Sequence, residues 1–320
     1  MNKKNIGIIG AGAWGTGIAQ ALSRGGHSAQ MWALEPEVKD FVNKQHENTK
    51  FLSGYKLSES ITVSNDIIEV ASNKDFLVIA SPSMYLAETI KKIKDVSNIL
   101  DGSTIIFALT KGFVPSNDGP KLILDTLEEN LPTIYKDNTV YVSGPSHAEE
   151  VAMGKITGIV AASRNPRNSI TVRDLLKVSG LMVFSSFDVI GVQVCAAAKN
   201  IIACVYGALD AIAETSSIVG DNTESLLLAA GLNEIQTLGF AMGAKYPETF
   251  TSISGIGDLD VTCKSKYGRN RRFGHDIVKT EILSKFKNID DLIENVGKLD
   301  IYRKVLLLVN MYTKFLKINI

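Results

Sequence analysis

The amino-acid sequence predicts an α/β protein in which a doubly wound parallel sheet is followed by an all-α domain. An apolar run at the N-terminus leads directly into Gly-x-Gly-x-x-Gly at positions 10–15. Short apolar runs then alternate with helical patterns through the first half, and long helical patterns replace them after about Ser186. Because alternating strands and helices form right-handed βαβ crossovers, the first half predicts a parallel sheet with helices on both faces.

Short continuous apolar runs are typical of parallel strands that are buried on both faces. The predicted strands are Asn5–Ile9, Ser28–Ala33, Phe76–Ala80, Thr104–Ala108 and Thr139–Val142. The predicted helices are Trp14–Ser23, Pro36–Gln45 and Leu86–Val96. In such a sheet ligands bind beyond the carboxyl ends of the strands, so functional residues are expected in the loops that follow them.

Each glycine of the N-terminal motif has a physical role. Gly10 permits the tight turn after the first strand, Gly12 lets the backbone approach a pyrophosphate, and Gly15 lets the next helix lie close to the strand. Free amides at the helix N-terminus would face the phosphates of a dinucleotide. The motif therefore predicts a Rossmann-like dinucleotide-binding domain. The alternative is a strand-to-helix turn with incidental glycines.

The second half of the chain has a different character. Helical patterns dominate from Val189 to Ala244, and Val192–Thr215 is almost entirely small and apolar. A helix of this composition is expected to be buried on most sides, in part by a second subunit. We therefore expect a dinucleotide-binding domain over 1–188, a helical substrate domain over 189–320, and a homodimer.

Composition argues against several classes of function. The 320-residue chain has a net charge of zero and 45% hydrophobic residues, which disfavours broad electrostatic binding to nucleic acid or to an anionic membrane. Charged residues interrupt the apolar stretch at 301–320 and no signal peptide is visible, so no membrane-spanning segment is expected. Three cysteines without a Cys-x-x-Cys spacing indicate a reduced, cytoplasmic protein. No Cys/His spacing predicts a metal site.

Glu35 follows Gly15 by 20 residues, at the end of the second predicted strand. A carboxylate here accepts hydrogen bonds from the adenosine ribose hydroxyls and repels a 2′-phosphate. NAD is therefore predicted as the preferred cofactor, with NADP as the alternative. Glu35 could also be an ordinary solvated glutamate before Pro36 at the start of a helix.

Polar residues follow two other strands. Lys111 comes after the strand that ends at Ala108 and could direct its ammonium group to a phosphate or a carbonyl oxygen. The segment Ser-Gly-Pro-Ser at 143–146 offers a hydroxyl and a glycine-opened backbone to an anion. Taken singly, each is also compatible with an ordinary solvated loop or turn.

Lys199 lies inside an otherwise apolar helical run, 194–204. A buried lysine is unfavourable unless it is paired or used, and burial lowers its pKa and suits it to proton transfer. The alternative is a lysine that extends from a buried helix to solvent. Asp258, in Gly-Ile-Gly-Asp-Leu at 255–259, is a second candidate, and helix capping is its alternative role.

Three arginines, Arg269, Arg271 and Arg272, gather in the segment 268–274 of a chain without net charge. Guanidinium groups bind phosphate through two parallel hydrogen bonds, so this cluster predicts a phosphate site. The alternative is a solvated basic turn. A single short cluster is poor support for binding nucleic acid.

Six motifs together resemble the bacterial-type NAD(P)-dependent glycerol-3-phosphate dehydrogenases. In order along the chain they are Gly-Ala-Gly-Ala-Trp-Gly-Thr at 10–16, Thr-Lys-Gly at 110–112, Ser-Gly-Pro-Ser-His-Ala at 143–148, Ala-Lys-Asn at 198–200, Gly-Ile-Gly-Asp-Leu at 255–259 and Arg-Asn-Arg-Arg-Phe-Gly at 269–274. The resemblance implies reversible conversion of dihydroxyacetone phosphate to sn-glycerol 3-phosphate, which supplies glycerophospholipid synthesis. Its partner would be a small phosphorylated triose.

The resemblance also implies roles for individual residues. Lys199 matches the proton donor and acceptor, with Asp258 orienting it and Lys111 adding positive potential. The positions that match substrate contacts are Lys111, Gly144, Ser146, Lys199, Asp258, Gly268, Arg269 and Asn270. The positions that match cofactor contacts are Gly10, Gly12, Ala13, Trp14, Gly15, Lys111, Ala148 and Arg269, to which the motif reasoning adds Glu35.

The chain departs from the family pattern in three places. Leu34 replaces a common Arg or His beside the adenosine, which further favours NAD, and Gly268 replaces a usual serine, which removes one substrate hydroxyl contact. After about Gly297 the expected Glu-Gly pair is missing, so we expect a reading-frame change or truncation there. That tail makes a catalytically impaired dinucleotide-binding or sensing protein the alternative function. A related dehydrogenase that acts on a carboxylate-bearing substrate is a further alternative.

Overall fold

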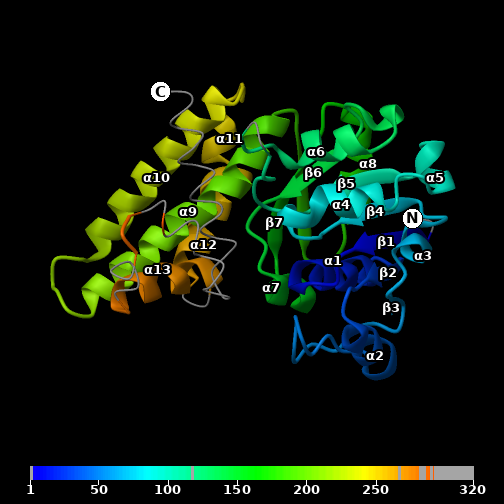
Figure 1. Cartoon of the computed structure of the whole chain (residues 1–320), viewed down its shortest axis with the longest axis horizontal. Coiled ribbons are helices and arrows are strands. Elements are labelled where there is room, and N and C mark those ends of the chain that lie inside the picture. Colours follow the sequence, from blue (N-terminus) through cyan, green and yellow to red (C-terminus); the bar gives the residue numbers. More distant parts are fainter. Residues whose placement is uncertain (1–2, 117–118, 266–267, 281–285, 289–290, 292–320) are drawn as a thin grey trace. The chain divides into compact units, whose positions relative to one another are not determined.

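The computed structural model describes residues 3–116, 119–265, 268–280, 286–288 and 291. The chain divides into two compact units (Figure 1). Unit 1 consists of Met1–Val114 and Leu122–Val189, and unit 2 consists of Pro115–Lys121 and Ile190–Ile320. The short segment that interrupts unit 1 was not anticipated from the sequence.

Unit 1 is built on an eight-stranded sheet with the order β3-β2-β1-β4-β5-β6-β7-β8. The strands are β1 (Asn5–Ile9), β2 (Ser28–Trp32), β3 (Ile61–Ser64), β4 (Phe76–Ile79), β5 (Ile105–Ala108), β6 (Val140–Ser143), β7 (Thr157–Ala162) and β8 (Leu181–Ser186). Its helices are α1 (Ala13–Arg24), α2 (Pro36–Gln45), α3 (Ile67–Ala71), η1 (Ser83–Tyr85), α4 (Leu86–Lys91), α5 (Ser97–Leu100), α6 (Ile123–Asn130), η2 (Thr133–Tyr135), α7 (Ala148–Met153) and α8 (Pro166–Leu176). This architecture confirms the predicted Rossmann-like α/β fold.

The strand order reverses beside β1, which pairs in parallel with β2 on one side and β4 on the other. In a doubly wound sheet, ligands bind in the crevice at this switch point, beyond the carboxyl ends of the strands. Gly10 and Ala80 follow β1 and β4 directly, so the glycine motif lies at the switch point.

The sheet differs from the prediction in one strand direction and in its number of strands. β6 and β7 pair antiparallel, with Ser143 opposite Val160, whereas the sequence suggested a wholly parallel sheet. The strands β3, β7 and β8 were missed. β3 has the sequence Ile-Thr-Val-Ser, which alternates apolar and polar residues and shows no continuous apolar run. β8 does begin with the apolar run Leu-Met-Val-Phe, although Met182 and Phe184 are exposed.

One predicted helix is wrong in its extent. The region Leu86–Val96 was expected to be a single helix, but α4 ends at Lys91 and α5 begins at Ser97. Val96 adopts extended backbone geometry and is buried, as is Ile93. The chain therefore turns here while it keeps an apolar spacing that imitates a continuous helix.

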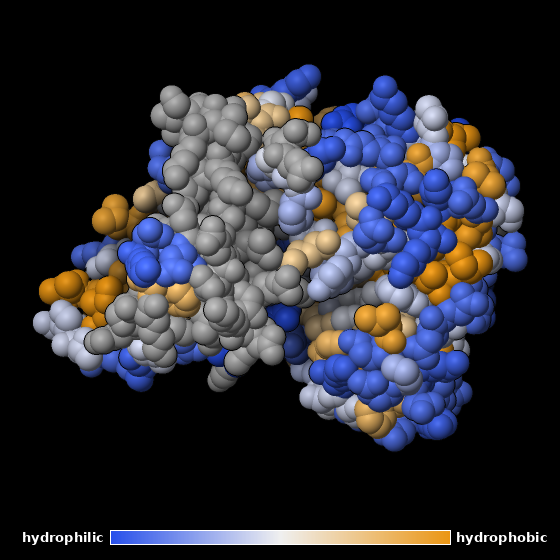
Figure 2. All heavy atoms as spheres, viewed as in Figure 1, coloured by the Kyte–Doolittle hydropathy of each residue, from blue (hydrophilic) through white to orange (hydrophobic). Residues whose placement is uncertain are grey.

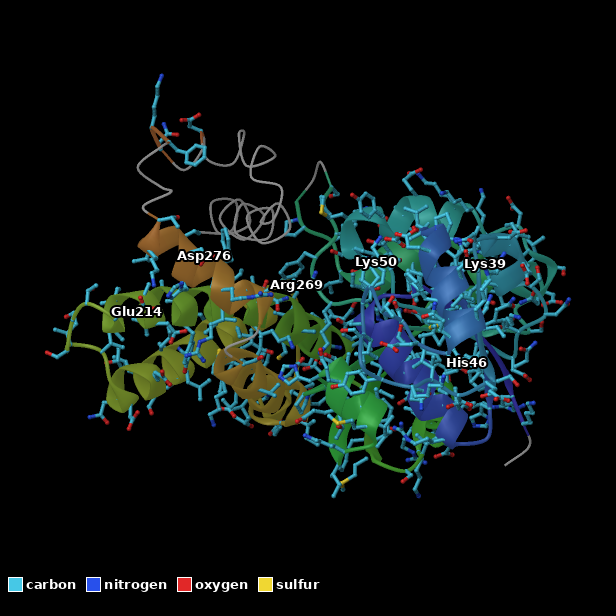
Figure 3. The ribbon with its side chains drawn as sticks, turned by 90° about the horizontal axis from the view of Figure 1, so that it is seen from below. Lys39, His46, Lys50, Glu214, Arg269 and Asp276 are labelled. Carbon is cyan, nitrogen blue, oxygen red and sulfur yellow. The ribbon has the colours of Figure 1, made fainter. Side chains whose placement is uncertain are left out.

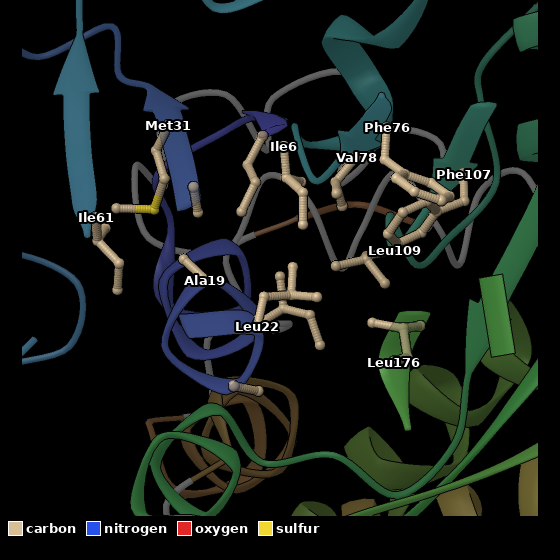
Figure 4. Close-up of a cluster of buried hydrophobic side chains, with 14 of the residues drawn as sticks. Ile6, Ala19, Leu22, Met31, Ile61, Phe76, Val78, Phe107, Leu109 and Leu176 are labelled. Carbon is tan, nitrogen blue, oxygen red and sulfur yellow. The ribbon is translucent and has the colours of Figure 1, made fainter. Parts of the chain in front are cut away.

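The core of unit 1 lies between the sheet and the helices α1 and α8 (Figure 4). Ile6 and Val78 from the strands meet Leu22 of α1 and Leu176 of α8, and all four side chains are fully buried. Alternate strand residues such as Leu77 are equally buried on the opposite face. Burial on both faces explains the continuous apolar runs of the central strands.

Unit 2 is all-α in its described residues. Its helices are α9 (Val189–Ala213), α10 (Asp221–Ala241), α11 (Glu248–Thr251), the π-helical turn η3 (Ile253–Gly257), α12 (Asp258–Lys264) and α13 (Arg269–Lys279). Glycines allow α9 and α13 to touch: a Cβ atom built on Gly207 would lie 1.7 Å from the Arg271 carbonyl oxygen, and one on Gly274 would lie 1.7 Å from that of Cys204. This close crossing brings the start of α13 toward the middle of α9.

Among the described helices, α9 is long and apolar enough to cross a membrane by length and composition, but 72% of its most apolar stretch is buried inside the protein. A buried core helix has the same composition. The chain's three cysteines, Cys195, Cys204 and Cys263, are buried in α9 and α12, and none of them forms a disulfide. Burial raises the pKa of both Cys204 and Cys263 to about 12, so these thiols are not reactive nucleophiles.

Candidate active site

Two glycines of the N-terminal motif are required by the protein's own backbone. Gly10 has a φ of +123°, and a Cβ atom there would lie 2.8 Å from the Ala80 backbone. A Cβ atom on Gly15 would lie 2.1 Å from the Gly10 carbonyl oxygen. Neither position tolerates a side chain, because β1, β4 and α1 approach one another too closely.

Gly12 is different because nothing in the protein requires a glycine there. Its φ of −69° suits any residue, and a Cβ atom would have no neighbour within 4 Å. The open space lies at the N-terminus of α1, where backbone N–H groups are available to an anion. Two buried polar atoms close to this loop, Trp14 Nε1 and Ser81 Oγ, have no hydrogen-bond partner among the described residues. These features fit a bound dinucleotide pyrophosphate.

Asn48 holds the glycine loop and was missed by the sequence reasoning. Its fully buried side chain donates hydrogen bonds of 2.8 Å to the Ala11 carbonyl and to the Thr16 hydroxyl. The same side chain accepts a hydrogen bond from the Phe51 amide at 3.2 Å. No periodicity or motif marks a buried asparagine within a polar loop, so the sequence offered little signal for it.

Glu35 lies where the sequence placed it, at the end of β2 and directly before α2. Its side chain is about one-third exposed and makes no capping hydrogen bond to the helix. The Nζ atom of Lys50 lies 3.6 Å from its carboxylate. Asn65 fixes the strand end by donating to the carbonyls of Ala33 and Glu35.

Lys111, Gly144 and Ser146 form a second cluster in unit 1, after β5 and β6. The Lys111 Nζ atom donates to the Gly144 carbonyl at 3.0 Å and lies 3.3 Å from the Ser146 hydroxyl, which itself donates to the Gly144 carbonyl at 2.8 Å. Gly144 has a φ of +145°, a conformation that favours glycine. Ala148 starts α7, and its carbonyl oxygen would lie 2.9 Å from a Cβ atom on Gly17 of α1.

In unit 2, Lys199 is 6% exposed and Asp258 is 1% exposed. The Lys199 ammonium group donates a short hydrogen bond to the Asp258 carboxylate. Asp258 begins α12 but does not cap it, since Gly257 occupies the N-cap position and the carboxylate faces Lys199. Lys199 therefore does not reach bulk solvent, and each charge compensates the burial of the other.

The start of α13 is tied to the residue after Lys199. Asn270 donates to the side-chain oxygen of Asn200 at 2.7 Å, which ties the first turn of α13 to α9. Arg269 is exposed at the first position of α13, and Gly268 precedes it as the N-cap residue. Figure 3 shows Arg269 at this end of the helix.

The three arginines of this segment do not act alike. Arg271 is 4% exposed and binds Asp210 through Nε at 2.5 Å and Nη2 at 2.6 Å. The hydrogen bond to Asp210 raises the pKa of Arg271 further. Arg271 thus joins α13 to α9 inside unit 2, and the prediction of a phosphate site built on all three arginines is wrong for this residue. Arg269 and Arg272 are exposed.

The predicted residues thus lie at strand ends in unit 1. In unit 2 they lie in the buried pair of Lys199 and Asp258 and at the start of α13, where Arg269 is exposed. The departure predicted after Gly297 lies outside the described residues. No group of three or more acidic, His or Cys side chains that could hold a metal occurs in the part of the chain that the structure describes.

Two family models match the chain. The N-terminal model of NAD-dependent glycerol-3-phosphate dehydrogenase matches residues 5–169, and the C-terminal model matches residues 188–315. The chain belongs to this family. The second match extends past Gly297, where the sequence lacks the expected Glu-Gly pair.

Individual relatives agree with the family models. A glycerol-3-phosphate dehydrogenase (NAD(P)+) of Treponema denticola is 54% identical over 305 residues, which covers 93% of this chain and 85% of the relative. One from Bacillus velezensis is 35% identical and covers 92% of this chain and 80% of the relative. The crystal structure of glycerol-3-phosphate dehydrogenase from Coxiella burnetii has a TM-score of 0.78 at 29% identity, covering 97% of this chain and 94% of that one.

This glycerol-3-phosphate dehydrogenase family member is an oxidoreductase that uses NAD or NADP and acts on a small molecule. The comparisons do not favour the alternative of an impaired sensing protein. A solved D-mandelate dehydrogenase, at 14% identity and a TM-score of 0.55, shares the fold alone.

Proposed function

We propose that the chain interconverts dihydroxyacetone phosphate and sn-glycerol 3-phosphate and thereby supplies glycerophospholipid synthesis. The observation that carries this proposal is the buried ion pair between Lys199 and Asp258. A buried lysine that is paired with a carboxylate is suited to donate a proton to a ketone oxygen. In the reverse reaction it accepts the proton from the alcohol.

A bound nicotinamide supplies or accepts the hydride. Lys199 Nζ donates a proton to the substrate oxygen as negative charge develops on it. Asp258 orients the ammonium group and favours its charged form in an apolar environment. Lys111 adds positive potential where the negative charge develops on the substrate oxygen, because a fixed cation stabilises such charge.

For the substrate phosphate we propose Arg269 and the amide group of Asn270, with Gly268 as the backbone that leads into them. Arg269 is exposed and can turn to an anion, and Asn270 is held on α9 by its hydrogen bond to Asn200, the residue that follows Lys199. Gly144 and Ser146 are proposed as further substrate contacts.

For the cofactor we propose the loop of Gly10, Gly12, Ala13, Trp14 and Gly15, together with Glu35, Lys111, Ala148 and Arg269. The open space at Gly12 and the unpartnered Trp14 Nε1 support the loop's role. Glu35 supports a preference for NAD, because its carboxylate suits the ribose hydroxyls.

The deciding experiment is NADH oxidation by the purified protein with dihydroxyacetone phosphate, repeated with NADPH. Carboxylate-bearing keto acids serve as competing substrates. Rapid oxidation with dihydroxyacetone phosphate alone supports the proposal. Turnover of a keto acid instead would identify a different dehydrogenase, and dinucleotide binding without turnover would identify a sensing protein.

We also propose that the protein is a cytoplasmic homodimer. Ile218, in the connection between α9 and α10, is 79% exposed, and Leu226, in the second turn of α10, is 69% exposed. Figure 2 shows hydrophobic residues gathered at this end of unit 2. Exposed apolar side chains that lie together favour burial against another protein surface, and a second copy of the chain is the proposed partner.

A further inference from the structure

A cation lies beside the two carboxylates at the start of α2. The Lys50 Nζ atom is 2.7 Å from Glu37 and 3.6 Å from Glu35. The hydrogen bond to Glu37 raises the pKa of Lys50, so its ammonium group is charged at neutral pH. Lys50 comes from the loop after α2, and Figure 3 shows Lys50 and Lys39 on either side of this helix.

The loop that carries Lys50 is fastened to the glycine loop. Asn48 donates to the Ala11 carbonyl and accepts from the Phe51 amide, so the backbone on both sides of Lys50 is held. The Lys50 ammonium also lies 5.5 Å from the centroid of the Phe51 ring. Lys50 can therefore exchange one partner for another by rotating its side chain, while its backbone stays in place.

The net negative charge at the end of β2 disfavours binding of a 2′-phosphate unless a cation contacts that phosphate. Glu35 and Glu37 carry two negative charges against the one positive charge of Lys50. Leu34 is 74% exposed and contributes no charge. Lys50 is 38% exposed, so an incoming phosphate can reach its ammonium group. An ammonium group binds phosphate as a compact charge.

We propose that Lys50 is the residue through which this chain accepts NADP. With NADP bound, the Lys50 ammonium group leaves Glu37 and binds the 2′-phosphate. With NAD bound, it stays on Glu37, and Glu35 accepts hydrogen bonds from the ribose hydroxyls. This inference rests on the proposed binding of the adenosine ribose at Glu35. If so, the choice between NAD and NADP depends on three side chains, Glu35 and Glu37 at the start of α2 and Lys50 in the loop after α2.

The experiment measures binding of NADH and NADPH to the full chain by calorimetry, without turnover. Lys50→Met should weaken NADPH binding by roughly 10-fold or more, the range for a charged hydrogen bond, and change NADH binding by less than about 3-fold. Lys50→Arg should restore NADPH binding. Glu37→Gln should strengthen NADPH binding, because it releases Lys50 and removes a negative charge.

Lys39→Met is the matched control, since it removes the same charge from the other side of α2. It should leave the preference between the two cofactors unchanged. In the unmodified protein, added salt should weaken NADPH binding more than NADH binding, and this difference should shrink in Lys50→Met.

Any of the following results would overturn the inference. Equal losses of NADH and NADPH binding in Lys50→Met would show that Lys50 only supports the loop. An effect of Lys39→Met as large as that of Lys50→Met would reduce the role to general surface charge. If the unmodified chain binds neither dinucleotide, the proposed function fails as well. If it binds both and Lys50→Met keeps the same preference, this inference alone fails.

Discussion

At the scale of single residues, the chemistry that we propose for unit 2 depends on the buried ion pair between Lys199 and Asp258. Removing one partner of such a pair leaves an uncompensated charge, which destabilises a protein more than loss of a surface pair. Lys199 and Asp258 are therefore expected to be sensitive both as structural and as functional residues. Experiments on them need a readout that separates folding from turnover.

Lys199→Ala should lower turnover by at least about 10²-fold, the lower end of general acid–base effects. NADH binding should change little, because the proposed cofactor loop belongs to unit 1. Steady-state kinetics and calorimetry on the same preparation measure both quantities. Near-normal turnover would remove Lys199 from the proton-transfer role, and loss of NADH binding would indicate general misfolding.

Alanine substitutions at Gly12 and Gly15 are predicted to have different effects, one on dinucleotide binding and the other on stability. Gly12→Ala should leave the melting temperature unchanged and weaken dinucleotide binding, because its Cβ atom occupies open space that the ligand needs. Gly15→Ala should lower the melting temperature, because its Cβ atom would lie 2.1 Å from the Gly10 carbonyl oxygen. Thermal unfolding with and without NADH compares them. A destabilised Gly12→Ala variant would mean that the protein itself requires this glycine.

The sequence indicated those site residues that belong to motifs or break a pattern. Lys199 stood out as a charge in an apolar helix, and the glycine loop stood out by its spacing. Asn48 and Lys50 did not stand out, because they lie in a polar loop. Asn48 contacts residues 37 and 32 positions earlier in the chain, and Lys50 contacts residues 13 and 15 positions earlier. Long-range contacts of polar side chains leave no periodic signal.

At the scale of elements, α13 combines three arginines with separate tasks. Arg271→Ala should lower the free energy of unfolding by about 2–3 kcal/mol, because Arg271 is buried but its partner Asp210 is partly exposed. Arg269→Ala should mainly raise the KM for the phosphorylated substrate, and Arg272→Ala, its exposed neighbour control, should do neither. Urea unfolding and steady-state kinetics measure these effects. Equal destabilisation by Arg271→Ala and Arg272→Ala would contradict this division.

The end of α13 also carries a pH-dependent contact. His275 Nε2 lies 2.8 Å from Glu214, which follows α9, and Lys279 binds the same carboxylate. The hydrogen bond to Glu214, followed by that to Asp276, raises the pKa of His275 above its usual 6.5. A raised pKa stabilises the fold below the unfolded value, and this stabilisation is lost as the pH rises through the folded value.

The melting temperature at about pH 6 minus that at about pH 8 should therefore be smaller in His275→Gln than in the unmodified protein. The effect should be small, because the pair is partly exposed. Glu214→Gln should reduce the difference in the same way. An unchanged difference in both variants would show that this contact does not couple folding to protonation.

Element types were predictable where one physical force dominated. Central strands that are buried on both faces have continuous apolar sequences, which made them recognisable. β1 and α2 were predicted with their observed bounds. The antiparallel direction of β7 was not predictable, because a run such as Thr-Gly-Ile-Val-Ala-Ala is equally apolar in either direction. Strand direction follows from the connection that precedes it, here the short helix α7.

At the scale of the whole molecule, the proposed homodimer is directly testable. Sedimentation should give twice the 34.7 kDa mass of the chain. Ile218→Asp together with Leu226→Asp should shift the protein to the mass of one chain, because charges at an apolar interface are not solvated. A dimer that survives both substitutions would place its interface elsewhere, and a monomeric unmodified protein would contradict the proposal.

The placement of the three buried cysteines has a practical consequence for experiments. All three lie in unit 2, whereas both tryptophans of the chain, Trp14 and Trp32, lie in unit 1. Indole fluorescence therefore follows melting of the sheet, and modification by a thiol reagent follows opening of the helices. The unmodified chain carries its own pair of independent reporters, so the order in which its two units unfold can be measured without attaching a label.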